Sequence, residues 1–322
     1  MLQSFSDLRL EDPTDSLRSE VARLQTVIAS MEQSWSWKLT RPIRIATKCI
    51  RIRQRQFYKR QALVKDLIIQ QSPMERASQV ISPKNYKVPN VCGIAHVYYT
   101  DLADEIVEAF LRCGTLNSVV ITTPTPKDNL LIDALEKLTR ERPKLNIAVL
   151  PVKNIGRDIY PFLQAIQHQF VLDCDVFLKI HTKKSLHLEE YKGRIWRQQL
   201  LADLCNDLEQ TSRIASSLYN DHEAWVACPK SFAAGKESCG GNSKNINWLT
   251  KQLGIATPKT FIFPEGSMFW AKKEIVNCLN KQSFNEHSFY FESNLINGTL
   301  THAIERLIGV IPVAAGKKIW LF

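Results

Sequence analysis

The sequence predicts an α/β protein with a mostly parallel sheet covered by helices on both faces. From Val88 onward, short apolar runs rich in β-forming residues alternate with stretches of helical periodicity. The length of 322 residues leaves room for such a domain and an N-terminal appendage. Hydrophobic residues make up 44% of the chain and charged residues 23%, which is ordinary for a globular protein and excludes wholesale disorder.

Four strands and three helices are expected to alternate in the first half of this domain. The strands are predicted at 91–99, 117–124, 145–152 and 176–182, and the helices at 101–114, 128–142 and 159–170. Parallel strands joined by helices need cover on both faces of the sheet. Ligands of such sheets bind beyond the carboxyl ends of the strands. We therefore expect function in the loops after Tyr99, Thr123, Val152 and Ile180.

Two N-terminal segments precede this domain, which we place at residues 88–322. Residues 1–32 contain an apolar seam spaced 4, 3, 4 and 3, formed by Leu17, Val21, Leu24, Ile28 and Met31. This is a heptad pattern, but about two heptads are short for a coiled coil. Residues 17–31 are predicted to mediate self-association or to pack as an amphipathic helix on the body. Residues 33–87 form a basic amphipathic segment and linker.

The net charge of +10 comes from one part of the chain. Residues 33–65 hold ten of the 42 basic residues and no acidic residue. The rest of the chain therefore has as many basic as acidic residues. Trp35 and Trp37 precede these charges. Aromatic rings beside cations suit an anionic membrane surface, which predicts peripheral attachment to the inner face of a membrane. Nucleic-acid binding, which we do not favour, and a solvated basic linker are the alternatives.

The expected compartment is the cytoplasm. No apolar run approaches the ~18 residues that span a bilayer, and the first residues do not resemble a secretory signal. The eight cysteines are scattered without a CxxC pair, which indicates neither a zinc site nor a disulfide framework. We therefore predict a reduced, cytoplasmic chain that is peripheral at the inner membrane face.

The loop after the third strand reads Lys153-Asn154-Ile155-Gly156-Arg157-Asp158. Arginine can hold a phosphate through two hydrogen bonds, and glycine lets the backbone approach a ligand closely. Ligand binding is the favoured interpretation. An ion pair between Arg157 and Asp158 that closes the turn is the alternative.

The stretch around the end of the fourth strand reads Lys179-Ile180-His181-Thr182-Lys183-Lys184-Ser185. His181, Lys183 and Lys184 could converge where an anionic group binds, with a lysine as a point charge for a diphosphate. A solvated basic turn is the alternative. Asp173-Cys174-Asp175 matches a DxD metal pattern, but it precedes the strand and so lies at its opposite end.

The C-terminal part contains a strand-like run, Phe263–Trp270, and a helical pattern that includes His302, Glu305 and Arg306. An acidic residue on a helix at the open end of the sheet suits a general base. A surface pair of Glu305 with Arg306 is the alternative.

Six motifs in order resemble the rhamnan synthesis protein F family of bacterial polysaccharide glycosyltransferases. They are N-x-G-R-D-x-x-P-F from Asn154, K-I-H-T-K-K-S from Lys179, W-R-x-x-L-L from Trp196, G-G-N from Gly240, F-P-x-G-S-M-F-W from Phe263 and G-T-L-x-H-A-I-E-R-L from Gly298. The match runs from about Val88 to the C-terminus. Each motif alone is modest, but six in order are specific.

This resemblance implies a nucleotide-diphospho-sugar transferase fold of the GT-A type. It implies a nucleotide-sugar donor, dTDP-rhamnose or a relative, and a polysaccharide or lipid-linked glycan acceptor. Donor-binding candidates are Asn154, Gly156, Arg157, Asp158, His181, Lys183 and Lys184, and acceptor-binding candidates are Gly266, Ser267 and Trp270. Where many relatives place a metal-binding DxD, this chain is cationic. We therefore expect no metal ligand, and a divalent metal is possible but not favoured.

One departure concerns the catalytic base. The family pattern is expected to have Asp before G-T-L, but this chain has Asn297, and an amide cannot act as a base. Glu305 or Glu292 would then take that role, and His302 would orient the acceptor or its base. The resulting prediction is an inverting glycosyltransferase. The alternatives are a non-catalytic carbohydrate-binding or assembly subunit, favoured by Asn297, and a basic membrane or nucleic-acid adaptor.

Overall fold

The computed structural model describes residues 88–184, 190–289 and 297–322. The predicted heptad helix at 1–32 and the basic segment at 33–87 lie outside these residues. So does the candidate base Glu292. The predictions for these segments therefore stay predictions.

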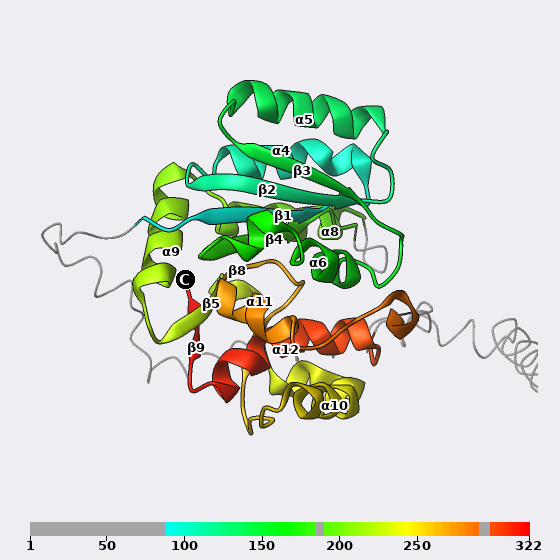
Figure 1. The fold of residues 1–322 in the computed structure, drawn as a ribbon, viewed down its shortest axis with the longest axis vertical. Coiled ribbons are helices and arrows are strands. Elements are labelled where there is room, and N and C mark those ends of the chain that lie inside the picture. The colour runs from blue at the N-terminus through cyan, green and yellow to red at the C-terminus, as the bar shows by residue number, and fades with distance from the viewer. Residues whose placement is uncertain (1–87, 185–189, 290–296) are drawn as a thin grey trace, which may run out of the picture. The chain divides into compact units, whose positions relative to one another are not determined.

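A seven-stranded sheet forms the centre of the described part, in the order β3-β2-β1-β4-β8-β5-β9 (Figure 1). The strands are β1 (Val91–His96), β2 (Leu116–Thr123), β3 (Asn146–Pro151), β4 (Val176–His181), β5 (Ala224–Cys228), β8 (Phe269–Lys272) and β9 (Lys318–Leu321). Strand β8 runs antiparallel to both neighbours, and every other pairing in this sheet is parallel. The prediction of a mostly parallel α/β sheet is confirmed. A separate antiparallel pair joins β6 (Ala233–Gly235) to β7 (Ile262–Pro264).

Helices cover both faces of the sheet, and each face has its own apolar core. One core receives side chains of α4 (Ala103–Leu111), α5 (Asn129–Glu141), α8 (Glu190–Leu204) and α9 (Leu208–Asn220). The other receives side chains of α6 (Ile159–Ala165), α7 (Gln169–Leu172), α10 (Ser243–Leu253), α11 (Lys273–Leu279) and α12 (Leu300–Ala314). Figure 1 shows α4 and α5 beside the β2–β3 end of the sheet and α10 and α12 beside the β5–β9 end. Short 3-10 turns occupy Thr100–Leu102, Lys230–Phe232, Lys236–Asn242 and Glu286–Phe289.

Strand β4 shows how the alternation of side chains builds the two faces. Val176, Leu178 and Ile180 enter the core beneath α8 and α9. The intervening Phe177 enters the opposite core, and Lys179 and His181 follow it on that same face because side chains alternate along a strand. All residues of this strand are buried. Lys179 and His181 must therefore find polar partners inside the protein.

Several predicted elements are shorter in the structure, and two of them show a clear physical reason. The helix expected at 159–170 is split into α6 and α7, because His168 accepts a hydrogen bond from the Phe170 amide at 3.2 Å and starts a new helix. The first strand ends at His96, and not at Tyr99. The amides of Tyr98 and Tyr99 turn to the Thr182 hydroxyl, at 3.0 and 3.1 Å.

The strand order places the switch point of the sheet between β1 and β4. The chain runs from β1 outward to β2 and β3, and then returns to the other side of β1 as β4. Connections on opposite sides diverge at such a point and leave room for a ligand. The last residues of the two strands, His96 and His181, face each other in register.

Candidate functional site

Two buried histidines stand at the switch point. His96 closes β1, and its Nδ1 atom lies 3.1 Å from both the carbonyl oxygen and the Oγ1 atom of Thr122. Burial lowers the pKa of His96 to about 4, against the field of Asp158, so the ring is neutral at pH 7. Burial likewise holds the pKa of His181 well below its ordinary value. The site therefore presents two uncharged imidazoles.

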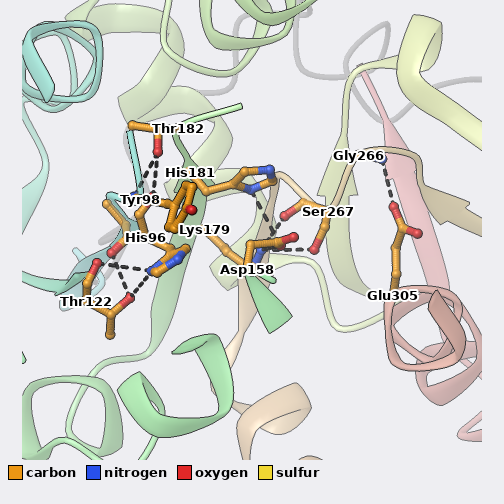
Figure 2. Close-up of polar contacts among 11 residues, drawn as sticks. His96, Tyr98, Thr122, Asp158, Lys179, His181, Thr182, Gly266, Ser267 and Glu305 are labelled. Atoms are coloured by element: carbon orange, nitrogen blue, oxygen red, sulfur yellow. Dashed lines mark hydrogen bonds and ion pairs between the residues drawn. The ribbon is translucent and has the colours of Figure 1, made fainter. Parts of the chain in front are cut away.

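Asp158, Lys179 and His181 form a group that we call the β4 polar cluster (Figure 2). The Lys179 ammonium lies 2.7 Å from Oδ2 of Asp158, and the same carboxylate oxygen is 3.5 Å from Nδ1 of His181. Lys179 also donates to the carbonyl oxygen and the hydroxyl of Ser267, at 2.6 and 2.9 Å. Phe162 and Phe269 flank this ammonium, with ring centroids 5.4 and 6.0 Å away.

The charges in this cluster depend on one another. Burial acts to raise the pKa of Asp158, but the charge and the hydrogen bond of Lys179 oppose it, and that pKa lies below the usual range. Burial lowers the pKa of Lys179, and Asp158 opposes that effect. The observed contacts therefore fit an ionised carboxylate paired with an ammonium, beside a neutral imidazole.

The turn at 264–268, between β7 and β8, brings a backbone amide to the same edge. Gly266 and Ser267 have φ values of +89° and +60°, a region that glycine enters freely and serine enters only with strain. A Cβ atom on Gly266 would lie 2.2 Å from the Trp196 ring, so only glycine fits. The Gly266 amide donates to Oε1 of Glu305 at 2.9 Å.

Glu305 is mostly buried on α12, and burial raises the pKa of its carboxyl group. Its Oε2 atom accepts from Arg306 at 2.6 Å. The fields of Lys183 and Asp158 also act on this carboxylate, which places it in the electrostatic neighbourhood of the β4 polar cluster. The pair with Arg306 left open by the sequence exists, but it is buried and not a surface pair.

Arg157 contacts His302, at the start of α12. Its Nη1 atom lies 3.1 Å from Nε2 of His302, while Nδ1 of that ring is 2.7 Å from the Thr299 hydroxyl. Arginine can only donate, so Nε2 accepts and Nδ1 carries the proton. Burial and Arg157 lower the pKa of His302 to about 4. The ring is thus a neutral link between two segments far apart in sequence.

The loop that carries Arg157 adopts a left-handed bend. Gly156 and Arg157 have φ values of +64° and +54°. A Cβ atom on Gly156 would meet Cβ of Tyr160 at 2.6 Å and the Phe289 ring at 2.9 Å. Asn154 is exposed, and its amide lies 3.4 Å from the Tyr98 hydroxyl. The bend turns Asp158 toward Lys179 and turns Arg157 toward His302, in place of the Arg157–Asp158 pair left open by the sequence.

Lys183 and Lys184 take different directions. The Lys183 ammonium lies over the Trp196 ring, 4.7 Å from its centroid. Lys184 pairs with Asp101 at 2.5 Å and lies over the Tyr99 ring. Trp196 also packs against Gly266, so Lys183 borders the 264–268 turn. Of the two lysines, Lys183 is the one that the structure connects to the rest of the site.

Trp270 does not fit the acceptor-binding role that the resemblance suggested. Its side chain is fully buried in β8, in the core beneath α8 and α9, and its Nε1 atom donates to the Leu204 carbonyl at 3.1 Å. An acceptor could reach it only if this core opened. Gly266 and Ser267, by contrast, contact Glu305 and Lys179, and their acceptor role stays a prediction.

Asn297 packs against the G-G-N motif. The buried Asn242 donates to Oδ1 of Asn297 and to the Cys239 carbonyl, and it accepts from the Gly298 amide at 3.1 Å. Asn245 donates to the Gly298 carbonyl at 3.2 Å. These bonds fix the backbone just before α12, so the G-G-N motif holds the segment that leads into His302 and Glu305.

The residues at the strand end do not fit a divalent metal of the DxD kind. The buried ammonium of Lys179 already occupies the carboxylate of Asp158. Within the described ranges, no three His, Cys, Asp or Glu side chains are grouped so that they could hold a metal ion. Asp173 and Asp175 stand at the start of β4, where Oδ2 of Asp175 accepts from the Asn90 amide at 2.9 Å.

Two site residues, Lys179 and His96, were not selected from the sequence. Lys179 was treated as part of the basic stretch, although it lies inside the apolar run Val176–Ile180. A single lysine in a buried strand needs a partner, and that signal could have identified it. His96 carried a weaker signal, a lone histidine near the end of an apolar run.

The fold and this site define an α/β protein with a buried polar cluster at the carboxyl ends of its parallel strands β1 and β4. Within the part that the structure describes, no helix is both long and apolar enough to cross a bilayer.

The chain belongs to the rhamnan synthesis protein F family, whose model matches residues 47–317. The resemblance read from the six motifs is thereby confirmed, and the family description links the chain to polysaccharide synthesis. Two curated relatives, from two strains of Xanthomonas campestris pv. campestris, are each named uncharacterized protein WxcX. Each is 32% identical over 233 residues, which is 72% of this chain and 32% of the relative. The chain thus spans about a third of the length of these relatives.

Proposed function

We propose that the chain is a glycosyltransferase with a GT-A-type fold, which moves a sugar from a nucleotide-diphosphate donor to a polysaccharide or lipid-linked glycan. The donor class that we propose is dTDP-rhamnose or a related sugar nucleotide, in keeping with the family description. The observation that carries the proposal is the position of Glu305. Its carboxylate has a raised pKa, and the turn that it contacts is the one that Lys179 ties to Asp158.

The donor diphosphate would bind between the segment holding Arg157 and the segment holding Lys183. Guanidinium and ammonium groups are suited to phosphate oxygens, the first as a fork and the second as a point charge. His302 orients the guanidinium of Arg157 through the 3.1 Å contact. Lys184 could contribute only if it left Asp101, so we assign it a lesser role.

The reaction would be a single displacement with Glu305 as the base. The acceptor hydroxyl gives its proton to the carboxylate, and its oxygen forms a bond to the anomeric carbon. The bond from that carbon to the phosphate oxygen breaks, and the nucleoside diphosphate leaves with the electron pair. One displacement inverts the anomeric configuration, so a product with retained configuration would refute this step.

We propose that cationic side chains neutralise the leaving diphosphate in place of a metal. Lys183 is the main candidate, since the neutral His181 can only offer a hydrogen bond. The poor fit of Asp158 and its neighbours to a DxD metal supports this view.

The first test is a thermal-shift panel of sugar nucleotides, measured in EDTA and then with Mg²⁺ or Mn²⁺. A ligand that binds only the native state raises its melting temperature. We expect one donor class to raise it in EDTA, and we expect Lys183→Ala to abolish the shift. Lys251→Ala, on the exposed side of α10, is the matched control and should keep it. No shift from any donor would overturn the donor site, and a shift only with metal would overturn its metal independence.

A non-catalytic carbohydrate-binding subunit is the second candidate, favoured by Asn297. The variant Asn297→Asp separates the two candidates, because an aspartate can still accept from Asn242 while it adds a carboxylate. For an enzyme that uses Glu305, this variant should change the transfer rate little. If the wild type is inactive and the Asn297→Asp variant transfers sugar, the chain is instead one that has lost its base.

We further propose that residues 33–65 attach the chain to the inner face of a membrane, where lipid-linked acceptors are found. The support is the concentration of ten basic residues beside Trp35 and Trp37. Deleting these residues should abolish sedimentation with vesicles that contain anionic lipid and leave donor binding intact. Loss of donor binding in the deletion variant would contradict the division between the two parts.

A further inference from the structure

The ring of His181 stands at the carboxyl end of β4 with its two nitrogens in different surroundings. Nδ1 faces Asp158, 3.5 Å from Oδ2, and it is sealed off from solvent without a full hydrogen bond (Figure 2). Among the described residues Nε2 has no hydrogen-bond partner either, but it is not sealed off in this way. Only 4% of the residue is exposed, and Nε2 is the ring nitrogen that a ligand can reach.

The contacts of Lys179 help to decide which nitrogen of His181 carries the proton. An ammonium group has three protons to donate. Lys179 donates them to Oδ2 of Asp158 and to the carbonyl and hydroxyl oxygens of Ser267, at 2.7, 2.6 and 2.9 Å. No proton of this ammonium is left for Nδ1 of His181. Nδ1 therefore does not act as an acceptor within the β4 polar cluster.

The carboxylate of Asp158 favours the same tautomer. An ionised carboxylate only accepts hydrogen bonds, so it attracts an N–H group at Nδ1 and repels a lone pair there. The ring is neutral and carries a single proton. With that proton on Nδ1, Nε2 keeps its lone pair. His181 thus presents an acceptor, and not a donor, at the end of β4.

An acceptor at this position discriminates between the parts of a sugar nucleotide. The diphosphate is ionised at neutral pH and has no proton to donate, so the lone pair of Nε2 repels it. A sugar hydroxyl, in contrast, donates readily. The surroundings also favour the sugar, because the fields of Asp158 and Lys183 act on both His181 and Glu305. The ring therefore shares its neighbours with the proposed base, which must approach the sugar.

We infer that Nε2 of His181 accepts a hydrogen bond from a hydroxyl group of the transferred sugar, in the tautomer that Asp158 and Lys179 impose. The inference rests on the proposed function, because it requires a sugar-nucleotide donor. It assigns His181 to selection of the sugar and leaves the diphosphate to Arg157 and Lys183.

The tautomer is tested first, on the full chain without ligand. Long-range ¹H–¹⁵N NMR of histidine-labelled protein at pH 7 distinguishes the two neutral tautomers and the charged ring. The chain has seven histidines, and the signal of His181 is the one lost in His181→Gln. We expect a neutral ring with its proton on Nδ1. A proton on Nε2, or a charged ring, would overturn the inference.

The second test uses calorimetry to separate the sugar from the nucleotide. The probes are dTDP, dTDP-rhamnose and the three analogues of dTDP-rhamnose that each lack one sugar hydroxyl. If the thermal-shift panel selects another donor, the corresponding compounds of that donor replace them. His181→Phe should bind dTDP-rhamnose about five- to tenfold more weakly, since one hydrogen bond is lost, and should bind dTDP as the wild type does.

The deoxy analogues identify the hydroxyl group. One of them should bind the wild type about five- to tenfold more weakly than dTDP-rhamnose does, and His181→Phe should add no further loss for that analogue. His181→Gln should recover much of the affinity, because the glutamine oxygen extends about as far as Nε2 and also accepts. His222→Phe, at an exposed position, should bind every probe as the wild type does.

Two results would overturn the inference: equal weakening of dTDP and dTDP-rhamnose in His181→Phe, or losses that add for every analogue. If His181→Phe does not fold, the ¹⁵N shift of Nε2 in the wild type decides. It should move when dTDP-rhamnose is added and stay unchanged with dTDP, and the same response to both would overturn the inference.

The proposed function is judged separately. If no sugar nucleotide binds the wild type, the proposed function falls and this contact falls with it. If a donor binds but no hydroxyl is coupled to His181, this inference alone falls.

Discussion

The Nζ atom of Lys179 lies 2.7 Å from Oδ2 of Asp158, and through this pair strand β4 is joined to the start of α6. The same ammonium donates to Ser267, so one buried cation connects three segments distant in sequence. A lysine with 2% of its side chain exposed is retained only where its charge is compensated. The positions of the loops at this edge of the sheet therefore depend on this contact.

Removing the charge of Lys179 should destabilise the fold. Lys179→Met leaves the Asp158 carboxylate without its cation, and breaking such a pair costs about 3–5 kcal/mol. Adding Asp158→Asn should recover part of the loss, because an uncharged amide tolerates burial better. Urea unfolding of both single variants and the double variant measures this coupling. Purely additive effects would contradict the pairing, and the exposed Lys230→Met should change little.

Acid should destabilise the protein through its buried histidines. His96 and His302 have pKa values of about 4 in the folded chain, whereas an unfolded histidine titrates near 6.5. Between these values the unfolded state binds a proton that the folded state does not. The free energy of unfolding should thus fall on acidification from pH 6.5 toward 4, by about 1.4 kcal/mol per pH unit for each histidine.

His96→Asn tests that slope, since the asparagine amide can still donate to the Thr122 carbonyl. Urea unfolding at pH 6 and pH 5 should show a slope smaller by about one proton. The low pKa of Asp158 acts in the same direction only near pH 4 and below, so it does not disturb this window. His222→Asn, at an exposed position, should retain the wild-type slope. An unchanged slope in His96→Asn would show that His96 is charged in the folded protein.

Glu305→Gln should reduce sugar transfer by about 10²–10⁴-fold, the usual contribution of a general base. The glutamine oxygen can still accept from the Gly266 amide, so the fold should persist.

In the wild type, the rate of sugar transfer should rise with pH as Glu305 loses its proton. The apparent pKa of this rise should lie above that of an ordinary glutamate, because burial raises the pKa of Glu305. The assay follows release of nucleoside diphosphate in the presence of a rhamnan oligosaccharide. Glu209→Gln, exposed on α9, is the control. A glutamine variant with half the wild-type rate would exclude Glu305 as the base.

Gly266→Ala should be more harmful than Gly254→Ala. Both positions have positive φ, +89° and +67°, and alanine is strained at each. Only at Gly266 would the new methyl group meet the Trp196 ring, at 2.2 Å, whereas nothing lies within 4 Å of a Cβ at Gly254. The extra cost should be about 1–3 kcal/mol by urea unfolding. Equal losses in the two variants would mean that the turn moves away from Trp196 freely.

Local sequence was sufficient for the strands that alternate with helices, but not for the other half of the sheet. The apolar runs that contain Ile94, Val120, Val149 and Leu178 identify β1 to β4 because each is short and rich in β-forming residues, and the first three are followed by a helical pattern. Strands β5 and β9 are short, and their pairing depends on residues nearly a hundred positions apart. No local pattern encodes such a contact.

The candidate site was predicted in outline. The ends of the third and fourth strands supplied Arg157, Asp158 and His181, because the rule for parallel sheets directs attention to those loops. The sequence did not indicate which partner each of these side chains contacts. Whether Asp158 pairs with Arg157 or with Lys179 depends on the left-handed bend at Gly156 and on the exact register of β4. Trp270 was misassigned because its motif contains both a turn at the site and a strand in the core.

The reversed direction of β8 has a consequence for how this family could diversify. Its antiparallel course lets the 264–268 turn, which precedes the strand, reach the edge where the parallel strands end. The sheet pairs Phe269 to Lys272 with β4, and Trp270 and Ala271 also with β5, but it leaves the preceding turn to be set by Gly266, Ser267 and their neighbours. Exchange of this turn between relatives, with the strand kept intact, would therefore leave the scaffold unchanged, which makes 264–268 a natural place to test the proposed substrate contacts by engineering.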